Sequence, residues 1–517
     1  MKDFGAKLKP WLKSHWKELT FFIIFTILNI FFLTYASRMY SISLTSKRSI
    51  LVLIFSIIAE IAAFMVVLKA KKLKWAIEKV FLILFIPIGL IYLLAIPIGR
   101  VPDENAHLTR AYGISIGHFI TSANEDGKYG EYLPNDLVAL NNSNKTYANT
   151  LNIINDTNDN YEFVDDSNIA IYNFFNFIPQ STGFLIGRIL SLPAVYSAYL
   201  ARLLNFICFT ALFYFAIKKA PFGKVFFFLI AFLPIVLQEA ISLSADCLAI
   251  GMSAALISFS LHLAYDKTAK LTSKNYIILL IFIFFESLCK IVYLPLCFLI
   301  FLIPTSKFKS KKDHLFRTII PIIAIIIINL IWLKIASQYL IEYNPGVNSG
   351  EQIKFIISSP LSYLQVIFNT CITSMYQFAY GMFGGWLEWL DVEIGHIYLV
   401  LTIIISSILV YKNSESKIKI SNASRAIIIA IVIATLGLIF TSLYIQWNPV
   451  GNGIVGGLQG RYFLPILMLT PAVACGLRKK HQNTTNLEEK ENHSLLYLFS
   501  VFYSVAAVII IIFSHLG

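Results

Sequence analysis

Long apolar runs constrain this chain more than any other feature of its sequence. Three of them, residues 19–36, 51–68 and 76–98, follow one another near the N-terminus. As helices that rise about 1.5 Å per residue, such runs are long enough to cross roughly 30 Å of hydrocarbon. Only 14% of the 517 residues are charged, whereas a soluble protein has about 25%. We therefore expect an all-α membrane protein.

The basic residues predict the orientation of the chain. Most of the 42 Lys and Arg residues lie in seven short segments: Met1–Lys17, Lys69–Lys79, Lys218–Lys224, Lys267–Lys274, Lys307–Arg317, Lys412–Arg425 and Arg478–Lys490. Short basic loops mark the cytoplasmic side of a membrane protein. This distribution favours a multi-pass protein of the cytoplasmic (plasma) membrane and argues against a nucleic-acid partner.

With these segments inside, the chain reads as a single polytopic membrane domain, residues 1–517, of about thirteen transmembrane helices. Two longer segments then lie outside, a large extracytoplasmic loop at residues 99–196, with 11 acidic and 5 basic residues, and a second at residues 336–395. The expected spans are 19–36, 50–68, 76–98, 197–217, 225–241, 244–265, 275–289, 291–304, 316–337, 396–411, 425–446, 462–477 and 494–514.

The motif Arg100-Val-Pro-Asp-Glu-Asn-Ala-His-Leu-Thr-Arg110 follows the third span on the outer side. Pro102 suits the first turn of a helix, on which Asp103, His107 and Arg110 share one face. On that face a carboxylate is able to accept a proton, and His107 and Arg110 are able to orient it or bind an anion. The alternative is structural, because acidic residues in a first turn stabilise the helix dipole without any catalysis.

Two basic residues lie near the outer ends of predicted spans. Lys290 separates two apolar runs, and Arg461 follows a glycine-rich loop within Gln459-Gly-Arg-Tyr-Phe-Leu-Pro465. Either residue is suited to bind a phosphate. The alternative for both is contact with lipid headgroups at a helix end, and the residues alone leave the two interpretations open.

Three further groups are candidates for sugar or acceptor binding. Trp386, Glu388 and Asp391 precede the tenth span, although an aromatic belt at the membrane interface is the more frequent explanation of such a tryptophan. Asp246 begins the sixth span, and Gln459 and Tyr462 flank Arg461. No Walker A motif, dinucleotide-binding glycine fingerprint, zinc-ligand spacing or GxSxG motif is present.

The segment Pro102-Asp-Glu-Asn-Ala-His-Leu-Thr-Arg-Ala-Tyr112 resembles the PDE-x-x-H-x-x-R-A-Y signature of a bacterial membrane-protein family, domain of unknown function 2142. Asn105 and Ala245 depart from the family pattern, which commonly has proline at these two positions. Further blocks that agree are Gln238–Asp246, Lys290–Pro295 and Leu458–Pro465, and Gly384–Asp391 agrees more loosely.

This family is similar to the GT-C glycosyltransferases, and the resemblance implies a GT-C-like fold. It also implies transfer of a sugar from a polyprenyl-phosphate carrier to a cell-envelope glycan or lipid-linked acceptor, on the outer face of the membrane and with inversion. Asp103 or Glu104 would be the base, and Lys290, Arg461, Arg110 and His107 would bind phosphate. No metal-ligand set is evident, although Asp103 with Asp246 offers ligands for a divalent cation.

Two other classes of function remain open at this stage. A transporter or flippase of lipid-linked glycans also needs many spans and outer basic residues, but such proteins usually show repeated halves and polar groups near the midplane. A non-catalytic subunit of an envelope-assembly complex is the third class.

Overall fold

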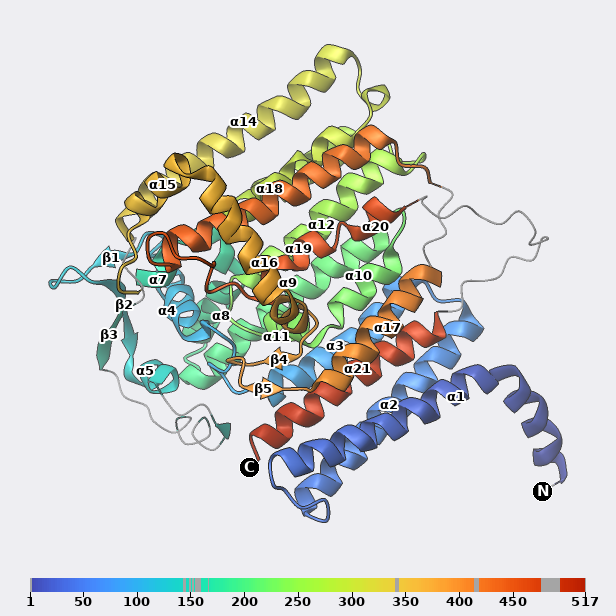
Figure 1. Ribbon diagram of the computed structural model, residues 1–517. Coiled ribbons are helices and arrows are strands. Elements are labelled where there is room, and N and C mark those ends of the chain that lie inside the picture. Colours follow the sequence, from blue (N-terminus) through green and yellow to red (C-terminus); the bar gives the residue numbers. More distant parts are fainter. Residues whose placement is uncertain are drawn as a thin grey trace.

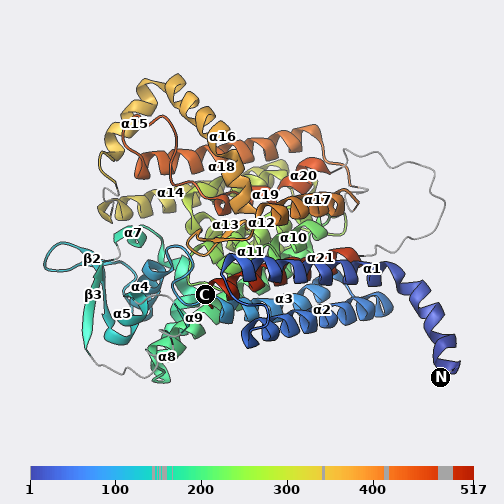
Figure 2. The same ribbon diagram turned by 60° about the horizontal axis from the view of Figure 1, so that its bottom comes forward.

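The chain folds into a bundle of apolar helices with a small polar subdomain at one end (Figures 1 and 2). In these two views the sheet and the helices α5 and α7 lie at one end of the bundle, and the N-terminus lies at the other. The computed structural model describes residues 2–142, 146–147, 150, 153, 160–165, 167–339, 344–412, 418–475 and 493–516.

Three long helices open the chain: α1 (Lys2–Met39), α2 (Lys47–Leu73) and α3 (Ile77–Ala95). The hydroxyl of Ser46 accepts a hydrogen bond from the Ser49 amide and so caps the start of α2. A kink at His15, where the backbone leaves helical geometry, turns the first part of α1 away from the bundle. These helices pack against the last helix, α21 (Ser494–Ser514).

The polar subdomain follows α3 and contains a three-stranded antiparallel sheet in the order β1-β2-β3. Gly130 of β2 pairs with Asp165 of β3, and Pro134 with Tyr161. The elements are α4 (Glu104–Ser115), β1 (Ser122–Ala123), β2 (Tyr129–Pro134), α5 (Asn135–Asn142), β3 (Tyr161–Asp165), α7 (Ser167–Ala170), the 3₁₀ helix η1 (Phe174–Phe177) and α8 (Ile178–Ile189).

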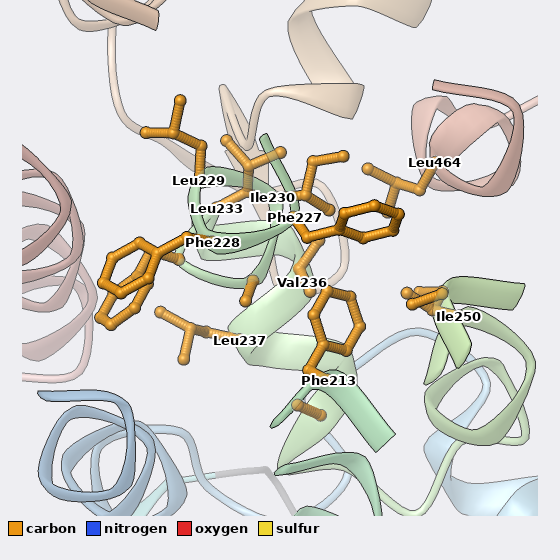
Figure 3. Packing of buried hydrophobic residues seen from close by; sticks show 14 of the residues in the cluster. Phe213, Phe227, Phe228, Leu229, Ile230, Leu233, Val236, Leu237, Ile250 and Leu464 are labelled. Atoms are coloured by element: carbon orange, nitrogen blue, oxygen red, sulfur yellow. The ribbon is translucent and has the colours of Figure 1, made fainter. Parts of the chain in front are cut away.

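The centre of the bundle is formed by α12, which is buried over almost its whole length. Around it the chain forms α9 (Ala194–Lys219), α10 (Lys224–Ala231), α11 (Pro234–Ala240), α12 (Asp246–Tyr265), α13 (Ser273–Cys289), the 3₁₀ helices η2 (Ile291–Leu302) and η3 (Thr305–Lys307), α14 (Lys311–Ala336) and η4 (Ser337–Tyr339). Figure 3 shows side chains of α10 and α11 packed among Phe213 of α9, Ile250 of α12 and Leu464.

The remaining elements lie between η4 and α21 in the sequence. They are α15 (Ser349–Ser358), α16 (Pro360–Met382), the two-stranded hairpin of β4 (Trp386–Leu387) and β5 (Val392–Glu393), α17 (His396–Lys412), α18 (Asn422–Trp447), η5 (Gly460–Phe463), α19 (Leu464–Leu467) and α20 (Thr470–Ala474).

The expected all-α membrane fold is confirmed in outline, but a count of thirteen spans is not. Among the described residues, eight helices are long and apolar enough to cross a membrane, or nine if α15 and α16, which meet at 106°, form one bent span. Three expected spans are interrupted. Residues 225–241 break before Pro234, residues 291–304 form a 3₁₀ helix around Pro295, and residues 462–477 divide into η5, α19 and α20. Proline removes a helical hydrogen bond and explains the first two interruptions.

The second expected outer segment, residues 336–395, contains the 23-residue helix α16, and the bent pair it forms with α15 is the candidate ninth span. Its hydroxyl and amide side chains dilute the apolar pattern that a span normally shows. The basic segment Arg478–Lys490 falls outside the described residues.

The two ends of the bundle give a direct test of orientation. We expect Asp126→Cys, in the β1–β2 turn, to react with a membrane-impermeant maleimide in intact cells, when the six native cysteines are replaced. Lys270→Cys, beyond the other end of the 20-residue helix α12, should react only after permeabilisation, because α12 spans about 30 Å. The reverse pattern would contradict the predicted orientation, and labelling of both from one side would contradict the two-sided arrangement.

Candidate functional site

Asp103 lies at the start of α4 with its backbone in the left-handed region, at φ 62°. Few residues other than glycine adopt this conformation, and aspartate is among those that tolerate it best. The carbonyl of Asp103 accepts the first intrahelical hydrogen bond, from the His107 amide. Its carboxylate is half exposed. The strained turn therefore presents one accessible carboxylate at the polar end of the bundle.

Arg461 is the centre of the cluster around this carboxylate. Its Nη2 donates to Asp103 at 3.3 Å and its Nε donates to Asp246 at 3.0 Å. The Nη1 atom lies 3.7 Å from a carboxylate oxygen of Glu239. The guanidinium is almost completely buried, so three carboxylates from different elements share one buried cation.

Gly460 fixes the position of Arg461. A Cβ atom at residue 460 would lie 2.1 Å from the amide nitrogen of Met382 and 2.5 Å from the carbonyl oxygen of Phe378. Both are backbone atoms at the end of α16, which cannot move aside as a flexible side chain would. The glycine thus allows η5 to touch α16 and brings the next residue, Arg461, to the cluster.

Lys290 forms an ion pair with Asp246 on the other side of the same carboxylate. It stands where α13 ends and the 3₁₀ helix η2 begins. The buried amide of Asn176 donates to the carbonyls of Leu288 and Cys289 and so caps this end of α13. The ring of Tyr462 lies 5.0 Å from the ammonium group, which adds cation–π attraction. Asp246 therefore joins the two cations.

His107 is buried next to the cluster, and this burial keeps its imidazole ring neutral. Burial lowers its pKa from 6.5 to about 4, the nearby cations Lys290 and Arg461 lower it further, and Asp103 and Asp246 oppose the shift. Its Nδ1 atom is buried without a hydrogen-bond partner. At neutral pH the ring is therefore able to donate or accept a hydrogen bond but brings no positive charge to a phosphate.

Glu104, the second predicted base, is enclosed. It is completely buried and accepts hydrogen bonds from Arg202 at 2.8 and 2.6 Å, from the Gly99 amide at 2.7 Å and from the Leu243 amide at 3.0 Å. These contacts tie the turn before α4 to α9 and to the turn before α12. They fix the two turns that carry Asp103 and Asp246, and the predicted role of Glu104 as a base stays a prediction.

The other predicted site residues lie at different points. Arg110 donates to the carbonyls of His118 and Phe119, in the loop after α4. Glu388 and Asp391 both accept hydrogen bonds from Arg100, and the ring of Trp386 packs against Tyr380. The Oε1 atom of Gln459, two residues before Arg461, is buried without a hydrogen-bond partner. The predicted roles of all these residues stay predictions.

A cavity of about 240 Å³ extends from the cluster between η2, α14 and α18. Lys290, Tyr172 and Tyr462 line it, together with apolar side chains of the three helices. Two of its lining residues, Ile291 and Leu333, are 38% and 44% exposed. The cavity therefore lies close to the outer surface of the helices.

Two buried residues of the site region were not among the predicted site residues. Arg202 lies inside a predicted span, and a charge at that depth is itself a signal of a structural or functional partner. Glu239 lies near Asp246 in the sequence, within one of the blocks that carry the family resemblance. Among the described residues, no group of three or more His, Cys, Asp or Glu side chains is placed to hold a metal ion.

One protein-family model matches the chain. It is described as "Predicted membrane protein (DUF2142)" and covers residues 84–470, well over half of the sequence. All the predicted site residues fall within this range, whereas α1, α2 and α21 lie outside it. Comparison with the curated proteins and with the solved structures gave no significant match in either case.

Removal of Arg202 tests the structural role of its contact with Glu104. We expect Arg202→Met to lose about 3–5 kcal/mol of stability, because a buried carboxylate is left without its cation. Thermal unfolding in detergent measures the change, with Lys270→Met, at an exposed position, as the control. Equal unfolding temperatures for the two variants would show that the buried pair does not hold the two turns together.

The neutral state of His107 predicts a dependence of stability on pH. Between pH 6.5 and about 4 the unfolded chain binds a proton at this residue that the folded chain does not, so stability falls as the pH falls through this window. A pKa shift of this size corresponds to about 3 kcal/mol. His107→Asn should therefore show a smaller loss of unfolding temperature between pH 7 and pH 4 than the unchanged protein. A parallel loss in both proteins would contradict the buried neutral state.

Proposed function

We propose that this chain, which belongs to the DUF2142 family of predicted membrane proteins, transfers a sugar from a polyprenyl-phosphate carrier to a hydroxyl group of a cell-envelope glycan or lipid-linked acceptor. The observation that carries the proposal is that Lys290 belongs both to a mostly apolar cavity between the helices and to a cluster of one accessible carboxylate and two cations. A donor with a long apolar tail and a phosphate needs both parts of such a site.

The two cations suit the phosphate of the donor. Asp246 holds Lys290 and Arg461 on either side of itself, which places both within reach of one anion. The Nη1 atom of Arg461 is buried and has no hydrogen-bond partner. Guanidinium groups bind phosphate oxygens in a fixed planar geometry, so a donor phosphate would compete with the Glu239 carboxylate, 3.7 Å away, for this N–H.

The cavity suits the apolar tail of the donor. Lys290 and Tyr462 line the cavity, and α14 and α18 supply the apolar side chains Leu333, Ile439 and Leu443. Burial of each CH₂ group of a tail contributes about 0.8 kcal/mol. A phosphate bound at Lys290 therefore directs its first isoprenoid units into this cavity.

The reaction is a direct displacement at the anomeric carbon. The Asp103 carboxylate takes the proton of the acceptor hydroxyl as the oxygen of that hydroxyl forms a bond to the anomeric carbon. The bond from this carbon to the phosphate oxygen breaks, and the phosphate leaves with the electron pair. Attack from the side opposite the leaving group inverts the configuration of the sugar.

The ion pair between Asp103 and Arg461 couples the two halves of this reaction. When Asp103 accepts the proton, its attraction for Arg461 falls, while negative charge grows on the departing phosphate. The attraction between Arg461 and the phosphate therefore becomes stronger in the transition state than in the ground state. Interactions of this kind increase the rate.

Replacement of Asp103 tests the proposal. Asp103→Asn removes the base but keeps the size of the side chain, and we expect the rate of sugar transfer to fall by about 100-fold or more. The assay follows a radiolabelled sugar from polyprenyl phosphate to an acceptor fraction of the cell envelope, with the purified protein in detergent.

Asp126→Asn, on the exposed β1–β2 turn, is the matched control and should transfer sugar at the unchanged rate. Movement of the labelled lipid only across sealed vesicles, with no transfer in detergent, would identify a transporter instead. Transfer that survives in Asp103→Asn would remove Asp103 from the role of base.

A further inference from the structure

The β4–β5 hairpin contacts the segment that precedes Asp103. Within its turn, Glu388 and Leu390 have φ values of 54° and 65°, a left-handed backbone conformation that residues other than glycine rarely adopt. Such strain persists only where the surroundings hold it in place. The amide of Glu388 donates to the side chain of Gln238 at 2.6 Å, next to Glu239 of the cluster.

Three side-chain contacts run from this turn to residues 99 and 100. Glu388 accepts from Arg100 Nε at 2.5 Å, Asp391 accepts from Arg100 Nη2 at 2.7 Å, and Trp389 Nε1 donates to the Gly99 carbonyl at 2.9 Å. Residues 99 and 100 precede Asp103 by four and three positions. Rotation of the turn before α4 would break all three contacts.

The last helix, α21, also contacts Glu388. His515, at the end of α21, lies 2.6 Å from the second carboxylate oxygen of Glu388. Glu388 is completely buried and His515 almost completely buried. One carboxylate therefore joins the hairpin, the Asp103 turn and α21, and α21 lies outside the part of the chain that the family model matches.

We infer that Glu388, supported by His515 and Trp389, is a positioning residue that holds Asp103 in line with the acceptor and Arg461. Glu388 is completely buried and each of its two oxygens accepts a hydrogen bond from a different partner, which favours a structural role over contact with a sugar. The inference rests on the proposed function for its kinetic consequence, but its structural part is independent of any activity.

The experiment compares Glu388→Gln with Glu393→Gln in the full-length protein. In Glu388→Gln the side-chain NH₂ group faces a donor of Arg100 or His515, and two donors cannot form a hydrogen bond. The substitution therefore weakens the contact of the hairpin with residues 99 and 100 or with α21. Glu393→Gln changes the same hairpin but keeps an acceptor for the Tyr380 hydroxyl and has no contact with residue 99 or 100 among the described interactions. Hydrogen exchange, read by mass spectrometry on peptides that cover residues 97–104, reports directly on the turn.

We expect amide exchange of residues 97–104 to become about 10-fold faster in Glu388→Gln and to stay unchanged in Glu393→Gln. The kcat for transfer should fall about 10- to 100-fold, as a small displacement of a reacting group is known to cause, while the KM for the donor stays within about twofold. If Glu388→Gln does not fold, Trp389→Phe carries the test, since it removes the indole N–H that donates to the Gly99 carbonyl and keeps an aromatic ring.

Unchanged exchange in Glu388→Gln, or in Trp389→Phe where that variant is used, would overturn the inference. An equal fall in kcat in Glu393→Gln would overturn it as well, because the effect would not depend on the contacts to residues 99 and 100. A third outcome separates the two ideas. If amide exchange is faster in Glu388→Gln but the unsubstituted protein transfers no sugar, the positioning role of Glu388 is supported and the proposed function is rejected.

Discussion

The buried guanidinium of Arg461 is the interaction on which the site depends. A cation in a bundle of apolar helices is costly unless carboxylates surround it, and here Asp103, Asp246 and Glu239 come from three separate parts of the chain to do so. The cluster contains Lys290 as well, and burial raises the pKa of the Glu239 carboxyl to about 7. When Glu239 is protonated, the two cations balance the two remaining carboxylates, and Asp103, the accessible one, is the carboxylate that the proposed reaction protonates.

The rest of the fold supports this cluster at fixed points. Glu104 and Arg202 join the turns before α4 and α12, Gly460 presses η5 against α16, and the β4–β5 hairpin holds the residues before Asp103. The apolar bundle buries α12, and Asp246 is the first residue of this helix, at the polar end of the bundle. Each support acts on the backbone near a cluster residue and not on the reacting groups themselves, which is how rigid elements keep a site within a fraction of an ångström of its working geometry.

The sequence predicted the membrane class and the helices that are long and continuously apolar, such as α2, α12 and α18, since hydrophobicity over a whole span is a local property. It also named Asp103, Asp246, Lys290 and Arg461, which the structure brings together. It did not predict the break before Pro234 or the length of α16, where proline and polar side chains compete with the apolar pattern. It could not predict the pairing of Glu104 with Arg202 or of Glu388 with His515, because contacts between residues about a hundred positions apart leave no spacing in a single sequence.

The central claim is that one phosphate binds between Lys290 and Arg461 with its tail in the cavity between α14 and α18. An electron cryomicroscopy structure of the protein in lipid nanodiscs with added polyprenyl phosphate measures this directly. We expect density for the phosphate within hydrogen-bond distance of the Lys290 ammonium and the Arg461 guanidinium, with continuous density for the tail along Leu333 and Leu443. A phosphate bound elsewhere, with this cavity empty or filled by a side chain, would show that the two cations do not form the donor site.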